Sequence, residues 1–150
     1  MRLIRKFLER VGSNLQVNED ETLKINNKRF TVTPGLGEYI VRWDKLVSAG
    51  RFLGKDRNDF HPSSILLSML SSEPDLNKIY VDRDTAWLFV CGRDIFEKNI
   101  LRVEGEFELG EYFLVMLDAE CLGYGKITKF EDMRILRNIF DIGDFLRRER

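Results

Sequence analysis

The spacing of apolar residues predicts a helix followed by short strands at the start of the chain. Apolar residues recur at helical spacing from Met1 to Val11, basic residues fill the other face, and Gly12 supplies a stop. Three later segments alternate apolar and polar positions, as half-buried strands do: Leu15 to Val17, Leu23 to Ile25 and Phe30 to Val32. Asn26-Asn27 is a turn signal between the last two strands. We therefore expect an amphipathic helix followed by an antiparallel meander.

The segment after the meander leads into a second helix. Thr33 to Gly37 contains proline and glycine and breaks the pattern, and Tyr39 to Val41 can form one more short strand. Pro62-Ser63-Ser64 is a helix-start signal with a serine at the N-cap. Pro74 prevents that helix from continuing and favours an extended backbone before it. We place a domain boundary there, which divides the chain into domains 1–74 and 75–150.

Short strands dominate the pattern of the second domain. Arg93 to Lys98 is long enough for one inserted helix, and Ile142 to Arg148 for a terminal one. Regularly spaced strands with turn signals between them indicate a small barrel or sandwich. The expected strands are Lys78 to Val81, Trp87 to Val90, Ile100 to Val103, Tyr112 to Leu117, Leu122 to Thr128 and Asn138 to Phe140. The predicted fold class is an α+β N-terminal domain, an antiparallel sheet with helices, followed by a small β-barrel.

The net charge of -1 conceals an uneven distribution of charge. The 150 residues include 24 basic and 25 acidic side chains. Residues 1–57 carry a net charge of +5, residues 58–125 of -8, and residues 126–150 of +2. Two basic ends can still form a basic face for nucleic acid, and a neutral total does not exclude it.

Composition also bounds the location of the protein. No apolar run approaches the roughly 20 residues that a membrane helix needs, so we expect no membrane span. Two cysteines are too few for a disulfide framework, and a reducing intracellular compartment fits best.

Two motifs that suggest ligand chemistry fail on their spacing. Gly50 to Lys55 looks like a phosphate-binding loop, but it has three residues between its glycines where four are needed, and Asp56 follows where Ser or Thr belongs. His61 is the single histidine, and with Cys91 and Cys121 it offers at most three ligands at unrelated spacings. Neither a nucleotide site nor a metal site is expected.

Candidate catalytic side chains have simpler structural explanations. Ser63 and Ser64 fit helix capping better than a nucleophilic triad with the one histidine. Glu104, Glu106 and Glu108 alternate, so on an extended strand their carboxylates would share a face, yet nothing in the sequence encloses them in a cleft. We expect a solvated acidic face that repels anions, and no enzymatic activity.

The basic C-terminal segment is the strongest candidate for ligand binding. Lys126, Lys129, Arg134 and Arg137 follow one another there, and Tyr124 lies between two glycines just before them. Lysine and arginine contact phosphates, glycines allow close approach of a backbone, and a tyrosine can stack on a base. The same pattern also fits a solvated basic surface with a core tyrosine, and composition does not decide between the two.

Cys91 to Ile127 resembles a PUA domain, the small RNA-binding barrel named after pseudouridine synthases and archaeosine transglycosylases. A glycine, here Gly92, precedes a short helix in that domain, and a turn glycine, here Gly110, precedes a buried strand. A Leu-Gly-x-Gly strand follows, here Leu122 to Gly125. Asn99 stands where the family usually has glycine, and asparagine tolerates the same left-handed backbone.

Two further stretches narrow the resemblance: LVSAGRFLGK, Leu46 to Lys55, and NIFDIGDFLRRE, Asn138 to Glu149. Together they resemble the Nip-seven family of large-subunit ribosome assembly factors, from about Leu46 to the C-terminus and more loosely over the N-terminal meander. Phe145 stands where the family often has tyrosine. The resemblance implies an N-terminal α/β domain fused to a C-terminal PUA domain, which agrees with a boundary near Pro74. The shortness of the chain resembles archaeal members.

The family resemblance implies a non-catalytic protein without cofactor that binds single-stranded, uridine-rich RNA during precursor ribosomal RNA processing. It also implies the exosome and the Shwachman-Bodian-Diamond family protein as partners, and a cytoplasmic location, nucleolar in a eukaryote. The implied RNA contacts are the basic residues that follow the Leu-Gly-x-Gly strand, with stacking by Tyr124: Lys126, Lys129, Arg134 and Arg137.

Two rival functions stay open at this point. The alternative to RNA binding is a protein interaction module of the ribosome assembly or exosome machinery, with weak or no RNA binding. An RNA-modifying enzyme is less favoured, because the residues before the PUA unit offer no nucleophile or cofactor loop.

Overall fold

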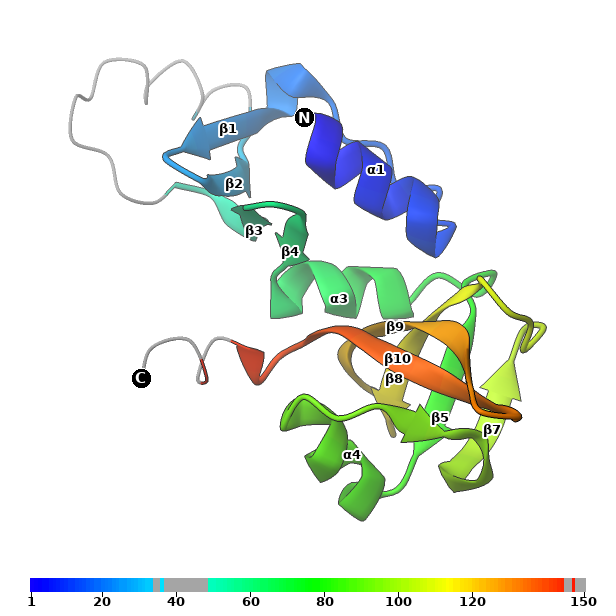
Figure 1. The fold of residues 1–150 in the computed structure, drawn as a ribbon. Coiled ribbons are helices and arrows are strands. Elements are labelled where there is room, and N and C mark those ends of the chain that lie inside the picture. Colours follow the sequence, from blue (N-terminus) through cyan, green and yellow to red (C-terminus); the bar gives the residue numbers. More distant parts are fainter. Residues whose placement is uncertain (34–35, 37–48, 145–146, 148–150) are drawn as a thin grey trace. The chain divides into compact units, whose positions relative to one another are not determined.

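The computed structural model describes residues 1–33, 36, 49–144 and 147, and the chain forms two compact units (Figure 1). The units are Met1–Leu66 and Leu67–Arg150. The domain boundary expected at Pro74 lies a few residues beyond this division and stays a prediction. The strand expected at Tyr39 to Val41 lies outside the described residues, as do three residues of the expected terminal helix: Phe145, Leu146 and Arg148.

The first unit is a four-stranded antiparallel sheet with one amphipathic helix. Its elements are α1 (Arg2–Val11), the short 3-10 helix η1 (Glu19–Glu21), β1 (Thr22–Ile25), β2 (Lys28–Thr31), β3 (Arg51–Asp56) and β4 (Phe60–Pro62). The strands lie in chain order, and each is antiparallel to the next. The expected helix, the strand at Leu23 to Ile25 and the Asn26-Asn27 turn are confirmed, and Asn26 has the positive φ of such a turn. The strand expected at Leu15 to Val17 is wrong, because this segment has no partner in the sheet.

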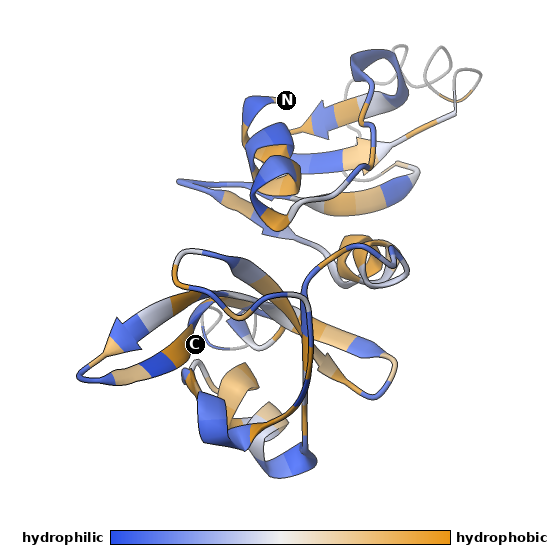
Figure 2. Cartoon of the chain, turned by 90° about the vertical axis from the view of Figure 1, so that its right-hand side faces the viewer, coloured by the Kyte–Doolittle hydropathy of each residue, from blue (hydrophilic) through white to orange (hydrophobic). Residues whose placement is uncertain are grey.

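Helix α1 packs its apolar side into this unit and ends at Gly12, whose left-handed backbone lets its N–H cap the last turn. Figure 2 shows the apolar and polar positions of the helix by hydropathy. The Phe7 and Phe60 rings contact each other with centroids 5.5 Å apart. Burial alone would raise the pKa of Asp59, but its hydrogen bond and ion pair with Arg10 outweigh this and hold the pKa below its usual value. The basic face of α1 is thus partly neutralised within the unit.

Helix α3 (Ser64–Ser71) begins at the capping serine that the sequence predicts. The Ser63 Oγ accepts a hydrogen bond from the Leu66 N–H (3.1 Å) and donates one to the Phe52 carbonyl (2.7 Å). The glycine-containing segment before it, Gly50 to Lys55, forms strand β3 rather than a phosphate-binding loop. Both results agree with the sequence analysis.

The second unit is a six-stranded sheet that curls into a half-barrel with one helix beside it (Figure 1). Its elements after α3 are β5 (Lys78–Val81), α4 (Arg83–Val90), β6 (Ile95–Phe96), the 3-10 helix η2 (Glu97–Asn99), β7 (Ile100–Glu104), β8 (Tyr112–Leu117), β9 (Glu120–Phe130) and β10 (Met133–Asp141). The strand order is β6-β10-β9-β8-β5-β7, and only the β5–β8 pair is parallel. The predicted fold class, an α+β domain followed by a PUA-type barrel, is confirmed.

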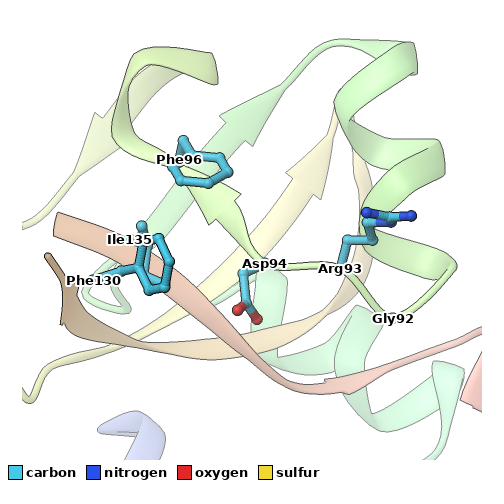
Figure 3. Close-up of a pocket in the computed structure, with 6 residues that line it drawn as sticks. All are labelled: Gly92, Arg93, Asp94, Phe96, Phe130 and Ile135. Atoms are coloured by element: carbon cyan, nitrogen blue, oxygen red, sulfur yellow. The ribbon is translucent and has the colours of Figure 1, made fainter. Parts of the chain in front are cut away.

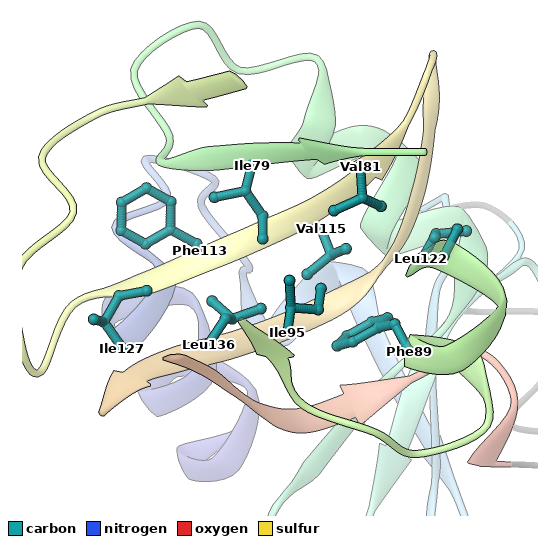
Figure 4. Packing of buried hydrophobic residues seen from close by; sticks show 10 residues of the cluster. Ile79, Val81, Phe89, Ile95, Phe113, Val115, Leu122, Ile127 and Leu136 are labelled. Atoms are coloured by element: carbon teal, nitrogen blue, oxygen red, sulfur yellow. The ribbon is translucent and has the colours of Figure 1, made fainter. Parts of the chain in front are cut away.

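The core of the second unit lies inside the curl of the sheet, where side chains from five strands meet α4 (Figure 4). We call this the inner face of the sheet and the opposite side the outer face. Its members are almost fully buried: Ile79, Val81, Ala86, Phe89, Ile95, Phe113, Val115, Leu122, Ile127 and Leu136. Burying an aliphatic or aromatic side chain of this size stabilises the fold by roughly 1.5–3 kcal/mol. The inner face is therefore structural.

Two element predictions in this unit are wrong. The expected strand at Trp87 to Val90 is the second half of α4, because the Asp82 carboxylate accepts a hydrogen bond from the Thr85 N–H (2.8 Å) and caps the helix. The same hydrogen bond lowers the pKa of Asp82. The expected helix at Arg93 to Lys98 is instead strand β6 and η2, because residues 95 and 96 pair with β10.

Two local expectations also fail. Glu104 ends strand β7, and Gly105 follows with a φ of 112°, so Glu104, Glu106 and Glu108 do not share one strand face. Asn99 closes η2 without a positive φ, so it does not take the left-handed backbone expected for it. The acidic segment is a loop instead of a flat carboxylate row.

Two classes of feature are missing from the residues that the structure describes. None of their helices is both long and apolar enough to cross a membrane. Within the same residues, no three His, Cys, Asp or Glu side chains gather where they could hold a metal ion.

The two thiols should differ strongly in reactivity. Cys91 is exposed, whereas burial raises the pKa of the Cys121 thiol to about 11. At a given pH below both values, raising the pKa of a thiol from 9.0 to about 11 lowers its thiolate fraction about a hundredfold. We expect native protein at about pH 8 to react rapidly with one equivalent of a maleimide, and C91S to lose that phase. Rapid labelling of C91S would contradict the burial of Cys121.

Candidate nucleic-acid interface

The four predicted basic residues all lie on the β9–β10 ribbon, in two directly opposed pairs. Lys126 is the cross-strand partner of Arg137, and Lys129 is the partner of Arg134. Directly opposed residues share a face, and positions an odd number apart on one strand point to opposite faces. Lys126 and Arg137 therefore lie on the outer face, whereas Lys129 and Arg134 lie on the face that carries the core. The sequence treats the four as one cluster, but the structure separates them.

Arg134 is held by contacts within the protein. Its Nε and Nη2 bond the two carboxylate oxygens of Glu97 (3.3 and 2.7 Å), and its Nη1 donates to the carbonyl of Phe107 (2.6 Å). The guanidinium carbon also lies 5.2 Å from the centroid of the Phe107 ring. Because its charge is paired with Glu97 in a bidentate contact, Arg134 offers a phosphate less than an unpaired arginine would. Arg134 thus ties β10 to η2 and to the loop before β8.

Lys126 and Arg137, which we call the outer pair, have no such neutralisation. Like charges directly opposite each other in an antiparallel pair destabilise a sheet. Within the described part of the chain, no carboxylate forms an ion pair with either side chain. The Lys126 ammonium lies 5.6 Å from the centroid of the Tyr112 ring, and Arg137 is exposed. The outer pair is a local concentration of positive charge that an anion would stabilise.

Figure 3 shows an apolar pocket lined by residues of β6, β9, β10 and the loop before β6. Phe96, Phe130 and Ile135 form its apolar wall, and Gly92, Arg93 and Asp94 complete the lining. The cavity measures about 360 Å³. Ile135 pairs with Phe96 across β6–β10, and the next residue of β10 on this face is Arg137. Phe130 is 50% exposed, so a free aromatic surface adjoins the cations.

Tyr124 does not fit the stacking role that the sequence suggests. Its side chain is 1% exposed, and its ring lies 6.3 Å from that of Tyr112, measured between centroids. A base needs an open ring face on which to stack, and this ring offers none. Tyr124 is a buried tyrosine on the same face of β9 as Lys126, which is the alternative that composition left open.

The two glycines of the Leu-Gly-x-Gly strand make room for strand β10. A Cβ on Gly123 would lie 2.1 Å from the Phe140 carbonyl oxygen, and one on Gly125 would lie 2.4 Å from the Arg137 oxygen. The register of β9 and β10 shifts at the same place, between Asn138 and Phe140. The close approach that glycine permits is therefore used by the protein's own backbone, which positions Arg137.

A buried polar network fixes the far end of β10. Asp141 is 1% exposed and pairs with the Arg147 guanidinium (2.8 and 3.0 Å), with the Gly143 N–H and with the Asn138 amide. The hydrogen bond to Asp141 raises the pKa of Arg147. Asn138 also donates to the Phe89 carbonyl (2.8 Å), and its own N–H bonds Asp94 (2.8 Å). The network joins β10 to α4 and to the loop that lines the pocket.

The pocket residues were missed by the sequence analysis. Arg93 and Phe96 fall in a segment expected to be helical, and Phe130 and Ile135 lie beyond the last expected strand residues of that region. A usable signal was present: Glu131-Asp132 is a polar pair that can form a turn between two segments containing β-branched and apolar residues. Extending both strands to this turn would have separated the two faces.

Comparison with known proteins was made for the sequence and for the fold. Residues 77–150 match the profile of the family described as UPF0113 PUA domain. The fold is similar to that of a conserved PUA domain protein from Thermoplasma acidophilum, with a TM-score of 0.58 and 14% identity over 99% of this chain and 94% of that one. A PUA domain from Aeropyrum pernix K1, solved as a tartrate complex, gives a TM-score of 0.55 and 15% identity over 95% and 83% of the two chains. A search of curated proteins gave no match.

At these identities the solved structures establish the fold alone. The sequence profile adds the assignment of residues 77–150, which include the whole of the segment from Cys91 to Ile127 that resembles such a domain. The chain thus carries, over residues 77–150, a PUA domain, a fold that generally binds RNA.

Proposed function

We propose that this protein is a non-catalytic RNA-binding protein that grips single-stranded RNA on the outer face of its PUA sheet. The observation that carries the proposal is the outer pair, Lys126 and Arg137, which lie directly opposite each other without a carboxylate partner in the described residues. Such a pair costs stability unless an anion offsets it. RNA phosphates supply that anion, and the PUA fold makes RNA the expected ligand class.

The geometry beside the outer pair suits a single strand better than a duplex. Unpaired bases can be splayed from the backbone and stacked on an exposed aromatic ring, whereas bases in a duplex cannot. Phe130 offers such a ring, and the cavity beside it is large enough for a base edge to enter. Arg93 at the pocket rim is a third cation for the phosphate backbone.

Acidic side chains near the pocket limit the electrostatic contribution that we expect to the affinity for RNA. Asp94 lines the pocket, although its Oδ1 is occupied by the Asn138 N–H, and Glu131 and Asp132 form the adjoining turn. Two or three phosphate contacts on a single strand predict a slope of log affinity against log salt of about -1.4 to -2.1. Binding should therefore be selective for RNA shape and bases as well as charge.

The proposal places the protein in large ribosomal subunit biogenesis, where it would bind uridine-rich precursor ribosomal RNA. It rests here on the resemblance of two stretches outside the PUA match, Leu46 to Lys55 and Asn138 to Glu149, to the Nip-seven family. The same resemblance suggests the exosome and the Shwachman-Bodian-Diamond family protein as partners and the cytoplasm as the location. Catalysis is not part of this function.

The test is a comparison of RNA ligands by fluorescence anisotropy. We expect a single-stranded uridine-rich RNA of about twelve nucleotides to bind more tightly than an adenine-rich strand or a duplex of equal length, at about 0.1 M salt. Absent binding to all three would overturn RNA binding. Equal binding to all three would overturn the preference for a single uridine-rich strand. Crosslinking in cells with sequencing of the bound RNA tests the ribosomal role, which fails if precursor ribosomal RNA is not enriched.

A further inference from the structure

Strand β7 forms the opposite edge of the sheet from the pocket and has an open side. It is the last strand in the sheet order and, among the described residues, pairs only with β5. The Ile100 N–H donates to the Glu97 carbonyl of η2, and the described residues make no further backbone hydrogen bond to Leu101–Glu104 outside the β5 pairing. An edge strand presents unpaired N–H and C=O groups, which another extended chain can bind. The edge is therefore available as a template for an added strand.

Apolar side chains on β7 are exposed to an unusual degree. Leu101 is 69% exposed and Val103 is 38% exposed. The register with β5 passes from Arg102 opposite Tyr80 to Ile100 opposite Val81, so Leu101 is the extra residue of a bulge. A bulge turns its extra side chain away from the regular pleat, and here it presents a leucine to solvent. Exposed leucine and valine on an open edge are typical of a docking strand.

Acidic residues follow this edge strand in the chain. From Leu101 to Glu111 the chain carries one basic and four acidic side chains. Arg102 is already used, since it pairs with Glu104 (3.2 Å) and lies 4.0 Å from the centroid of the Tyr80 ring. Glu106 and Glu108, just after the strand, are exposed, and neither has an ion pair within the described residues, whereas the carbonyl of Glu111 accepts a hydrogen bond from Ile127 of β9. The end of β7 therefore attracts cations and repels RNA.

We propose that β7 is a docking strand for an extended, lysine- or arginine-rich segment of a partner protein. The segment adds to the open edge by main-chain hydrogen bonds, its apolar residues cover Leu101 and Val103, and its cations meet the glutamates after the strand. A second copy of this chain is the alternative occupant of the edge, and the variants below distinguish it from a basic peptide. The proposal does not depend on RNA binding, since the outer pair belongs to β9 and β10.

We expect the peptide and RNA to bind at the same time, because they use different residues. The pocket is lined by residues of β6, β9, β10 and the loop before β6, and η2 lies between β6 and β7 along the chain. No described residue belongs to both surfaces. A basic segment bound at β7 would add positive charge to an acidic region without blocking the outer pair.

The first test uses a synthetic peptide that alternates lysine with valine, and a control that alternates glutamate with valine. We expect the lysine peptide to bind the full chain and to slow amide hydrogen exchange in residues 100–104. We expect the glutamate peptide to bind at least about tenfold more weakly. Equal binding of the two peptides, or protection confined to other strands, overturns the proposal.

Matched variants separate charge from apolar contact. E106Q/E108Q and L101S alter exposed residues and should each weaken peptide binding about fivefold. E9Q/E120Q removes the same number of charges from exposed residues elsewhere and should change binding less than about twofold. Affinity for uridine-rich RNA should stay constant in all of them. A concentration-dependent dimer of the chain alone that L101S dissociates would assign the edge to a second copy instead and overturn the proposal.

Discussion

Replacing Gly123 by alanine should lower the free energy of unfolding of the C-terminal unit by about 3 kcal/mol or more. Two costs combine there: the new Cβ would lie 2.1 Å from the Phe140 carbonyl oxygen, and the residue has a φ of 150°. The obstructing atom is backbone, so relief requires β10 to move away from β9. Urea unfolding followed by circular dichroism measures the change.

Two further glycine variants separate these costs. G125A adds a Cβ 2.4 Å from the Arg137 carbonyl oxygen without a left-handed φ, so it isolates the contact. G110A keeps a φ of 91° but meets no atom within 4 Å, so it isolates the backbone conformation and should cost about 1 kcal/mol. If G110A destabilises the protein as much as G125A, close packing of β9 on β10 is not the reason for these glycines.

Removing the outer pair should give the largest loss of RNA affinity. In K126A/R137A, the dissociation constant for uridine-rich RNA should rise about tenfold or more at low salt, because two phosphate contacts are lost. The slope of log affinity against log salt should become shallower by about 1.4, the value for two contacts on a single strand. Anisotropy titrations at several salt concentrations measure both quantities. The fold should persist, because the substitution also removes a like-charge repulsion.

A control variant with the same change in net charge tests whether the loss of RNA affinity is specific to the outer pair. Lys98 and Lys129 are exposed and lie off the outer face, so K98A/K129A should change the dissociation constant less than about threefold. An equal loss in both double variants would mean that general electrostatic attraction, and not the outer pair, determines binding. R134A is a poor control, because it also breaks the contacts to Glu97 and Phe107.

The sequence predicted strands and helices best where periodicity was long or a cap was present. The helix from Met1 to Val11 and the strand from Tyr112 to Leu117 have strong patterns and form as expected. The run from Trp87 to Val90 is four apolar residues, which periodicity alone cannot assign to strand or helix. Asp82 favours the helix for this run, since its side chain caps a helix that starts at Arg83. The capping aspartate was in the sequence, and giving it more weight than the apolar run would have corrected the assignment.

The candidate site was predicted in composition but not in geometry. The basic C-terminal segment was identified from charge, and the family profile supports its place in a PUA domain. The outer pair is separated from Lys129 and Arg134 by the register of β9 with β10. A sequence does not specify that register until both strand ends are known. Arg134 illustrates the consequence, because its engagement by Glu97 comes from a segment 37 residues away. Such long-range pairing leaves no local pattern.

The place of β10 in the sheet has a consequence for protein synthesis. Strand β6 is hydrogen-bonded only to β10, which is the last strand to be made, and β10 also contributes Ile135 and Arg137 to the RNA-facing surface. Pairing between strands that are distant in sequence forms late, because the intervening loop must first be closed. A nascent chain still lacking β10 can form the pairing of β5 with β7 and β8, but it has no pocket. The surface that we assign to RNA therefore comes into existence only when translation of the domain is nearly finished, which protects incomplete chains from occupying RNA.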